Sequence, residues 1–170
     1  IKHSHLRGNQ LNIPKMRCEE VDKKAFEYFK FYQKNIKENI AQGKNLYIWS
    51  YGCGNGKTTT AIKLLLAYFD EIWAGNGMKK RGIFVNVPQF LLEIHDNFEL
   101  KSTDFLEFKQ ELKTIDLLIL DDLGVSKRHN NYDNEQILSI VDERTLNNLT
   151  TIYTSNIAPE DLGNILDMRT

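Results

Sequence analysis

Apolar and polar positions change their spacing along the chain, and each change predicts an element. Between positions 21 and 41 apolar residues, among them Ala25, Phe29 and Ile36, recur at helical spacing with charged residues between them. The glycine of "QGK" at 42–44 is a typical helix stop. This part of the chain is therefore expected to be one amphipathic helix.

The pattern then shifts to short apolar, β-prone runs separated by longer helical ones. The four expected strands cover 45–50, 82–87, 116–124 and 150–156. Five helices are expected between and after these strands. The first is "TTTAIKLLLAYF", the second begins at Pro88, and the third extends from a capping box of Asp104 and Glu107 to Leu112. The fourth covers 134–148, and the fifth is the short segment "PEDLGNIL". Strands that alternate with helices predict an α/β fold with a parallel sheet covered on both faces.

Composition narrows the class of protein. A chain of 170 residues is one domain by length, and its net charge of −1 excludes a global basic field for nucleic acid. Cys18 and Cys53 are far apart and indicate neither a zinc site nor a disulfide framework, so a reducing, cytoplasmic compartment is expected. No apolar run approaches the ~20 residues of a membrane span, and no membrane association is expected.

The candidate chemistry begins in "SYGCGNGKTTT", at 50–60. It nearly matches the phosphate-binding pattern G-x-x-x-x-G-K-[ST], with Tyr51 in the place of the first glycine and Gly52 one position late. Glycines let backbone N–H groups approach phosphate closely, and the following helix adds its positive N-terminal end. Gly52 is expected to take the sharp turn that Tyr51 avoids. The alternative is a glycine-rich turn with a chance Gly-Lys-Thr.

We expect Lys57 to reach the β- and γ-phosphates and the Thr58 hydroxyl to bind Mg²⁺. The residues expected to contact the nucleotide are Tyr51, Gly52, Cys53, Gly54, Asn55, Gly56, Lys57, Thr58 and Thr59.

Two acids and an amide follow later strands. The run "LLILDDLG" delivers Asp121 to hold Mg²⁺ and Asp122 as the candidate base that orients water. Asn156 ends "YTSN", where an amide can lie between metal and γ-phosphate, since ligands bind at the carboxyl ends of parallel strands. Each could instead be an ordinary turn residue, and Arg169 either a surface arginine or an arginine finger.

"SYGCGNGKTTT", "LLILDDLG", "TIYTSN" and "LDMR", in this order and spacing, resemble the AAA+ ATPases of the DnaC/DnaI helicase-loader group, whose relatives include the transposition ATPase IstB. The G-N-G-K-T loop after a serine-containing strand end resembles that of phage and mobile-element variants, so we expect a protein of this kind. The resemblance extends over 13–170 and implies a P-loop NTPase of AAA+ type, a three-layer αβα sandwich with a parallel sheet.

The same resemblance implies roles for single residues. Lys57 and Thr58 correspond to Walker A, Asp121 and Asp122 to Walker B, Asn156 to sensor 1, and Arg169 to the arginine finger. The departures are Tyr51 for glycine, Asp122 where many AAA+ proteins have glutamate, and Met168 where the group often has serine.

From the resemblance we expect an arm at 1–20 and an AAA+ core at 21–170, with the C-terminal lid absent or truncated. It implies ATP or ADP with Mg²⁺ as cofactors and an ATPase that is weak as a monomer. It also implies a hexameric replicative DNA helicase, single-stranded DNA and head-to-tail self-association as partners.

Contacts with DNA have several candidate positions. Aromatic residues interleave with lysines after the second strand, an arrangement that suits base stacking or, equally, a core with a solvated face. These residues are Phe90, His95, Phe98, Lys101, Phe105, Phe108 and Lys109. "KKRG" (79–82) and "SKRHNN" (126–131) are local basic patches. His3 and His5 have a spacing open to metal ligands, but no cysteine or carboxylate cluster accompanies them.

The functional hypothesis is therefore a helicase loader that uses ATP to place a replicative helicase on single-stranded DNA at initiation. Three alternatives stay open. One is an IstB-like ATPase acting on duplex DNA, another is a small-molecule P-loop kinase, and the last is a module that holds nucleotide without turnover. The kinase would need lid arginines, where this chain has "LLILDD" and "TSN".

Overall fold

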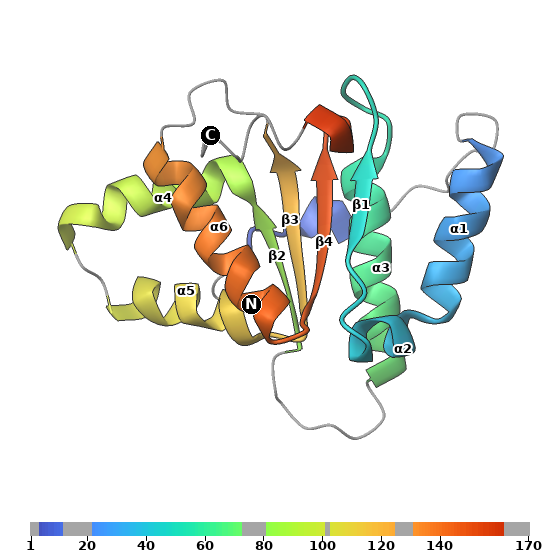
Figure 1. The fold of residues 1–170 in the computed structure, drawn as a ribbon, viewed down its shortest axis with the longest axis horizontal. Coiled ribbons are helices and arrows are strands. Elements are labelled where there is room, and N and C mark those ends of the chain that lie inside the picture. Colours follow the sequence, from blue (N-terminus) through green and yellow to red (C-terminus); the bar gives the residue numbers. More distant parts are fainter. Residues whose placement is uncertain (1–3, 12–21, 73–80, 101–102, 125–130, 162–170) are drawn as a thin grey trace.

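The computed structural model describes residues 4–11, 22–72, 81–100, 103–124 and 131–161, and it confirms the parallel α/β architecture. The four strands are β1 (Leu46–Trp49), β2 (Gly82–Asn86), β3 (Leu117–Leu123) and β4 (Thr150–Ser155). They form one sheet in the order β1-β4-β3-β2, and every neighbouring pair is parallel (Figure 1). Each expected strand is present within a residue or two of its predicted ends.

The helices connect these strands. They are η1 (Gly8–Leu11), α1 (Lys23–Lys34), α2 (Ile36–Ala41), α3 (Lys57–Ile72), α4 (Val87–Leu100), α5 (Thr103–Thr114) and α6 (Asn131–Leu146). The single helix expected at 21–41 is wrong, because the chain breaks at Asn35, whose side-chain amide donates to Phe31 O (2.8 Å) and competes with the helical pattern. Within the described ranges no helix is long and apolar enough to cross a bilayer.

The first turns of α4 and α5 contain the two helix-start signals that were identified in the sequence. Pro88 lies in the first turn of α4, as expected of a residue with no N–H to contribute there. The capping box is wrong: α5 begins at Thr103, so Asp104 lies inside the first turn instead of capping it, and the helix continues past Leu112.

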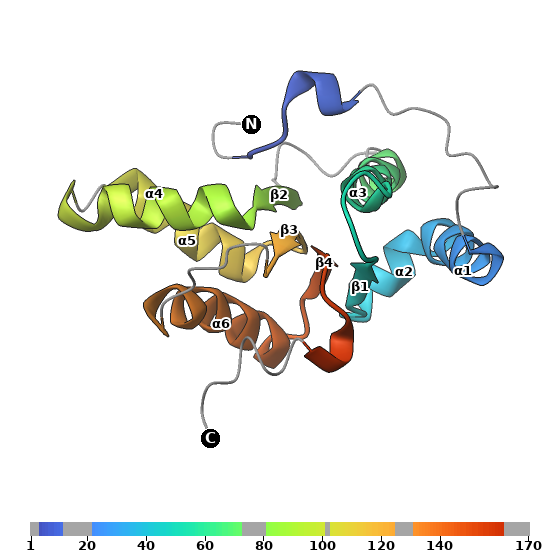
Figure 2. The same ribbon diagram turned by 90° about the horizontal axis from the view of Figure 1, so that it is seen from above.

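The sheet is the middle layer of three, and alternate residues of its strands face opposite cores. Ile83 and Leu118 pack with α4, α5 and α6, whereas Phe84 and Ile119 pack with α1, α2 and α3. Figure 2 shows α3 on one side of the strands and α4, α5 and α6 on the other. Burial on both faces explains why β2 and β3 are nearly continuous apolar runs.

Parallel pairing brings the carboxyl ends of all four strands to one edge. The glycine loop follows β1, the two acids lie near the carboxyl end of β3, and Asn156 follows β4. Because β4 lies between β1 and β3, these segments become neighbours. Ligands bind at this edge of open parallel sheets.

The buried guanidinium of Arg144 connects the end of α5 with the start of β4 by hydrogen bonds. Arg144 of α6 is 1% exposed, and its guanidinium donates to Leu112 O (2.8 Å), Ile115 O (2.7 Å), Thr150 O and Thr151 Oγ1 (2.8 Å). Burial lowers its pKa to about 10, which still leaves the group protonated at neutral pH. Arg144 therefore satisfies the end of α5 and the start of β4 at once.

Replacing Arg144 with methionine is expected to lower the free energy of unfolding by about 3–5 kcal/mol, because several buried carbonyls lose their donor while the side-chain volume is kept. Urea denaturation measures the change. The matched control is Arg81→Met, whose half-buried ion pair with Asp116 is worth about 1 kcal/mol or less. Equal losses in both variants would contradict the role assigned to Arg144.

Candidate functional site

The glycine loop after β1 has the backbone of a phosphate cradle. Gly52, Gly54 and Gly56 have φ of 84°, 81° and 77°, a region that residues with a Cβ rarely adopt. A Cβ added at any of the three meets nothing within 4 Å, so the space beside the loop is open. Tyr51 is not among the described residues with positive φ, which confirms that Gly52 takes the turn in its place.

Lys57, the first residue of α3, folds back over this loop. Its ammonium donates to Gly52 O (2.9 Å), Ser50 Oγ (3.2 Å) and Ser50 O (3.4 Å), all of them neutral oxygens. The side chain is buried, yet none of these three contacts neutralises its charge. A cation held this way, at the start of a helix and beside a glycine loop, is suited to an anion of high charge.

Asn55 stabilises the loop from within. Its side-chain amide donates to Tyr51 O (2.8 Å) and Ser50 Oγ (3.2 Å), which ties the last turn of the loop to its first. The Tyr51 ring is exposed and meets Trp49 edge-on at 5.2 Å. The Cys53 thiol is free and exposed. Thr58 and Thr59 are partly buried in the first turn of α3.

Asp121 lies near the carboxyl end of β3 and is 2% exposed. Thr154 on the neighbouring strand donates its hydroxyl to Asp121 Oδ1 (2.7 Å). Burial raises the pKa of Asp121, while hydrogen bonds from Thr154 and Thr58 lower it again. The contact with Thr58 brings the two expected magnesium ligands, one from α3 and one from β3, to the same place.

Asp122 occupies a β-bulge and has φ of 60°, which is uncommon for a residue with a side chain. Its backbone N–H donates to Thr154 Oγ1 (3.0 Å), and its Oδ2 accepts from Asn86 Nδ2 (3.4 Å). The bulge shifts the pairing of β3 with β4 between Leu120 and Leu123. Bulges re-aim side chains beside functional sites, and this one lies at the second of two consecutive acids.

Sequence reasoning did not single out Thr154 or Asn86. One hydroxyl of Thr154 serves both acids, and Asn86 reaches Asp122 from the end of β2. Thr154 stands in "YTSN", two residues before the expected amide, and Asn86 ends the apolar run "GIFVN". A polar residue at the carboxyl end of a buried strand was the available signal in each case.

Asn156 follows β4 at the same edge. Its Oδ1 is buried and has no hydrogen-bond partner among the described residues. The site thus combines this unpartnered acceptor with the buried carboxylate of Asp121 and the hydroxyl of Thr58. Mg²⁺ prefers oxygen ligands, and it is usually held by few protein groups together with phosphate oxygens. No cluster of three or more acidic, histidine or cysteine ligands occurs in the described part of the chain. Arg169 lies outside the described residues.

A groove of about 470 Å³ extends from the loop along α1 and β1. Asn55 and Lys57 line its polar end, and Phe26, Phe29 and Trp49 belong to its aromatic part. Sequence reasoning missed this feature, since the aromatic residues of α1 fit an ordinary amphipathic helix. A groove that joins a phosphate cradle to aromatic walls has the chemistry for a nucleoside.

The candidate DNA-contact zone is largely core. Phe90 and Phe108 are buried against the helices of one face, and Phe105 packs on the same cluster, so the interpretation of these rings as core is confirmed. His95 pairs with Asp133 (2.8 Å). The structure does not describe the side chains of Phe98 and Lys101, nor positions 79–80 and 126–130 of the two basic patches. In the described part of the first patch, Arg81 forms an ion pair with Asp116.

Of the paired histidines, His3 lies outside the described residues. His5 contacts Asn86 and Glu93 and belongs to no cluster of three metal-binding side chains among the described residues.

The chain was compared with known proteins. No family model matches it. Over 138 residues, 81% of its length, it is 26% identical to the replicative helicase loader DnaI of Bacillus subtilis, and it spans 40% of the length of that protein.

Solved structures agree with the fold. The crystal structure of the DnaC helicase loader matches with a TM-score of 0.71 at 22% identity, over 92% of this chain and 85% of that one. The replication initiator DnaA bound to AMPPCP and single-stranded DNA matches with a TM-score of 0.60 at 23% identity, over 85% of this chain and 40% of that one. The fold is therefore the α/β fold of these AAA+ ATPase domains.

Proposed function

We propose that this chain, a relative of the AAA+ helicase loaders of the DnaC/DnaI group, binds and hydrolyses ATP to help place a replicative DNA helicase on single-stranded DNA. The observation that carries the proposal is the meeting of three segments at one sheet edge. The glycine loop with Lys57, the acid pair Asp121 and Asp122, and the unpartnered Asn156 Oδ1 together supply what a magnesium nucleotide needs. The ATPase unit is proposed to be the core at 21–170, preceded by the arm.

Different residues of the site are proposed to bind phosphate, hold the metal and activate water. Lys57 and the loop N–H groups bind the phosphates, and Thr58 and Asp121 hold Mg²⁺. When bound, Mg²⁺ neutralises charge that develops on the phosphate oxygens. Asp122 orients the attacking water and accepts its proton, and the Asn156 amide orients the terminal phosphate. Thr154 holds the two acids in place, since its hydroxyl donates to the Asp121 carboxylate and accepts the backbone N–H of Asp122.

The base and sugar are proposed to lie in the groove along α1. Its aromatic lining buries the flat faces of a purine, and Asn55 and Lys57 lie where the groove meets the loop. DnaA matches this fold in complex with AMPPCP, an ATP analogue, which supports ATP as the nucleotide.

Partners are proposed from the relatives. DnaI and DnaC are helicase loaders, so a hexameric replicative helicase is the proposed protein partner, with single-stranded DNA as the nucleic acid and head-to-tail self-association as the assembly. Pull-down of the full-length protein with replicative helicases, with and without ATP, tests this. Retention of a helicase that depends on nucleotide supports the proposal, and absence of any helicase under both conditions contradicts it.

Lys57→Ala is expected to weaken binding of ATP and ADP by about 1.5–3 kcal/mol, because it removes a charge-assisted contact to phosphate. Titration with a fluorescent nucleotide measures the dissociation constants. The matched control is Lys63→Ala, two turns further along α3, which should bind as the wild type does. Equal affinity of wild type and Lys57→Ala would remove the nucleotide site from the loop.

A further inference from the structure

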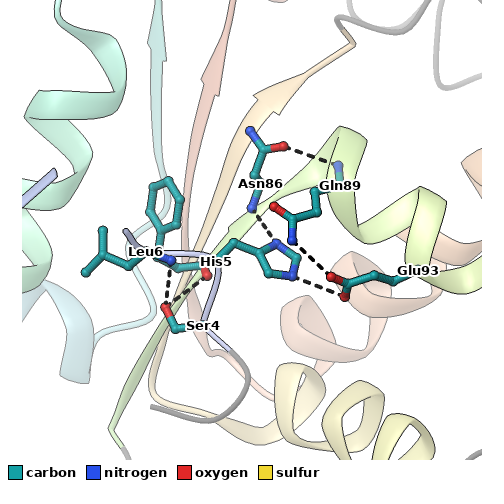
Figure 3. A network of polar contacts seen from close by, with 7 residues as sticks. Ser4, His5, Leu6, Asn86, Gln89 and Glu93 are labelled. Atoms are coloured by element: carbon teal, nitrogen blue, oxygen red, sulfur yellow. Dashed lines mark hydrogen bonds and ion pairs between the residues drawn. The ribbon is translucent and has the colours of Figure 1, made fainter. Parts of the chain in front are cut away.

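Ser4 and His5, in the described part of the arm, lie along the outer edge of β2, the last strand of the sheet. The His5 N–H donates to Phe84 O (3.1 Å), as a parallel neighbouring strand would. A regular strand would then accept the Asn86 N–H with its carbonyl, but here the His5 ring accepts it, at Nδ1 (3.1 Å; Figure 3). A single residue of the arm thus satisfies two backbone groups that an edge strand otherwise leaves unpaired.

The His5 ring is held from its other side as well. Its side chain is 6% exposed, and Nε2 lies 3.2 Å from Glu93 Oε2 on α4. Because Nδ1 accepts a hydrogen bond, the network assigns the proton to Nε2, which donates to Glu93. The next residue, Leu6, packs on the core of the opposite face. The arm is therefore anchored on both sides of the β2 edge.

Asn86 connects this anchor to the nucleotide site. It is the last residue of β2, and α4 begins at the next position. Its Oδ1 accepts from Gln89 N (3.2 Å) and caps α4, and its Nδ2 donates to Asp122 Oδ2 (3.4 Å). The cap fixes which end of the amide faces Asp122. The backbone of Asn86 is held by His5, so the arm and the acid are two hydrogen-bonded contacts apart.

We propose that His5 is a positioning residue for ATP hydrolysis. The imidazole fixes the end of β2, which aims the Asn86 amide and so orients the Asp122 carboxylate. Release of the arm from β2 therefore slows hydrolysis without weakening nucleotide binding, since the glycine loop and Lys57 lie outside the contacts of His5. The inference rests on the proposed function in that it takes Asp122 as the base.

A measurement without nucleotide tests the connection. In protein labelled with ¹⁵N at asparagine, the side-chain NH₂ resonance of Asn86, assigned by its loss in Asn86→Ala, reports the contact with Asp122. His5→Gln keeps a donor near Glu93 but removes the acceptor at Nδ1, whereas His5→Asn keeps an acceptor near the Nδ1 position. We expect His5→Gln to shift the Asn86 resonance toward its position in Asp122→Ala, and His5→Asn to leave it near the wild-type position.

The matched control is Ser4→Ala, which removes another contact of the arm with β2, the hydrogen bond from Ser4 Oγ to Phe84 O (3.3 Å), without touching Asn86. It should leave the resonance in place. An unmoved resonance in His5→Gln, or an equal shift in Ser4→Ala, overturns the proposal. Thermal melting of each variant shows that it is folded.

Kinetics separate positioning from structural support. His5→Gln should lower the rate of hydrolysis about ten-fold at an unchanged nucleotide dissociation constant, a loss typical of supporting partners, and His5→Asn should recover most of it. A lower affinity with an unchanged rate, or a faster rate, overturns the proposal. If the wild type does not hydrolyse ATP, the proposed function is wrong. If Asp122→Asn hydrolyses ATP at the wild-type rate, Asp122 is not the base. In either case the Asn86 resonance still shows whether His5 and Asp122 are connected.

Discussion

A mixture of full-length Arg169→Ala and Lys57→Ala subunits is expected to hydrolyse ATP that neither variant hydrolyses alone. An arginine finger acts on a nucleotide bound by the neighbouring subunit. Each Arg169→Ala subunit keeps an intact glycine loop, and each Lys57→Ala subunit keeps an intact Arg169. At some junctions of a mixed assembly the two intact parts face each other, and the γ-phosphate regains a charge worth about 10³–10⁵-fold in rate.

The measurement is ATP turnover as the ratio of the two variants is changed, under conditions in which subunits assemble on helicase or DNA. Head-to-tail contacts are heterologous and build rings or open spirals, so mixed junctions form in proportion to composition. Full activity of Arg169→Ala alone would make Arg169 an ordinary surface residue. So would absence of recovery in assemblies shown to contain both variants.

Asp122→Asn is expected to bind ATP as tightly as the wild type and to lose about 10²–10⁴-fold in hydrolysis, the usual contribution of a general base. The amide fits the space of the carboxylate, and the Thr154 hydroxyl still accepts the backbone N–H at this position. The substitution therefore removes the proton acceptor while leaving Asp121 and the loop intact.

Single-turnover hydrolysis and nucleotide titration on the same preparation separate the two effects. Asp142→Asn, the same change at an exposed position of α6, is the matched control and should keep the wild-type rate. Turnover at the wild-type rate in Asp122→Asn, within whatever assembly is active, would show that another group activates water.

The four strands were predictable because their signal is local. A strand buried on both faces needs a continuous apolar run, as in "GIFVNV" and "LLILDDLG", and β-branched and aromatic residues mark the strands in "NLYIWS" and "TTIYTSN". The break at Asn35 and the start of α5 were not predictable from spacing. Apolar residues stay in helical phase across the break, and a side-chain hydrogen bond to Phe31 O decides where the helix ends.

The glycine loop was predictable for a related reason, since its three glycines can adopt the positive φ of a phosphate cradle and the Lys-Thr that follows completes the motif. The bulge at Asp122 was not. Its two acids are neighbours in sequence, and their different surroundings come from Thr154 and Asn86, which belong to other strands.

The local amino-acid pattern was enough to predict the four strands, the glycine loop and the polar side chains at the strand ends, because each depends on residues within one strand or turn. Three features came only from the folded chain: His5 completes the edge of β2, Asn86 joins the arm to Asp122, and Arg144 is buried among carbonyls. These contacts are hydrogen bonds between segments distant in the chain, most of them to backbone groups that every residue carries. Such bonds leave no periodic or compositional pattern, so they form only once packing has brought the segments together.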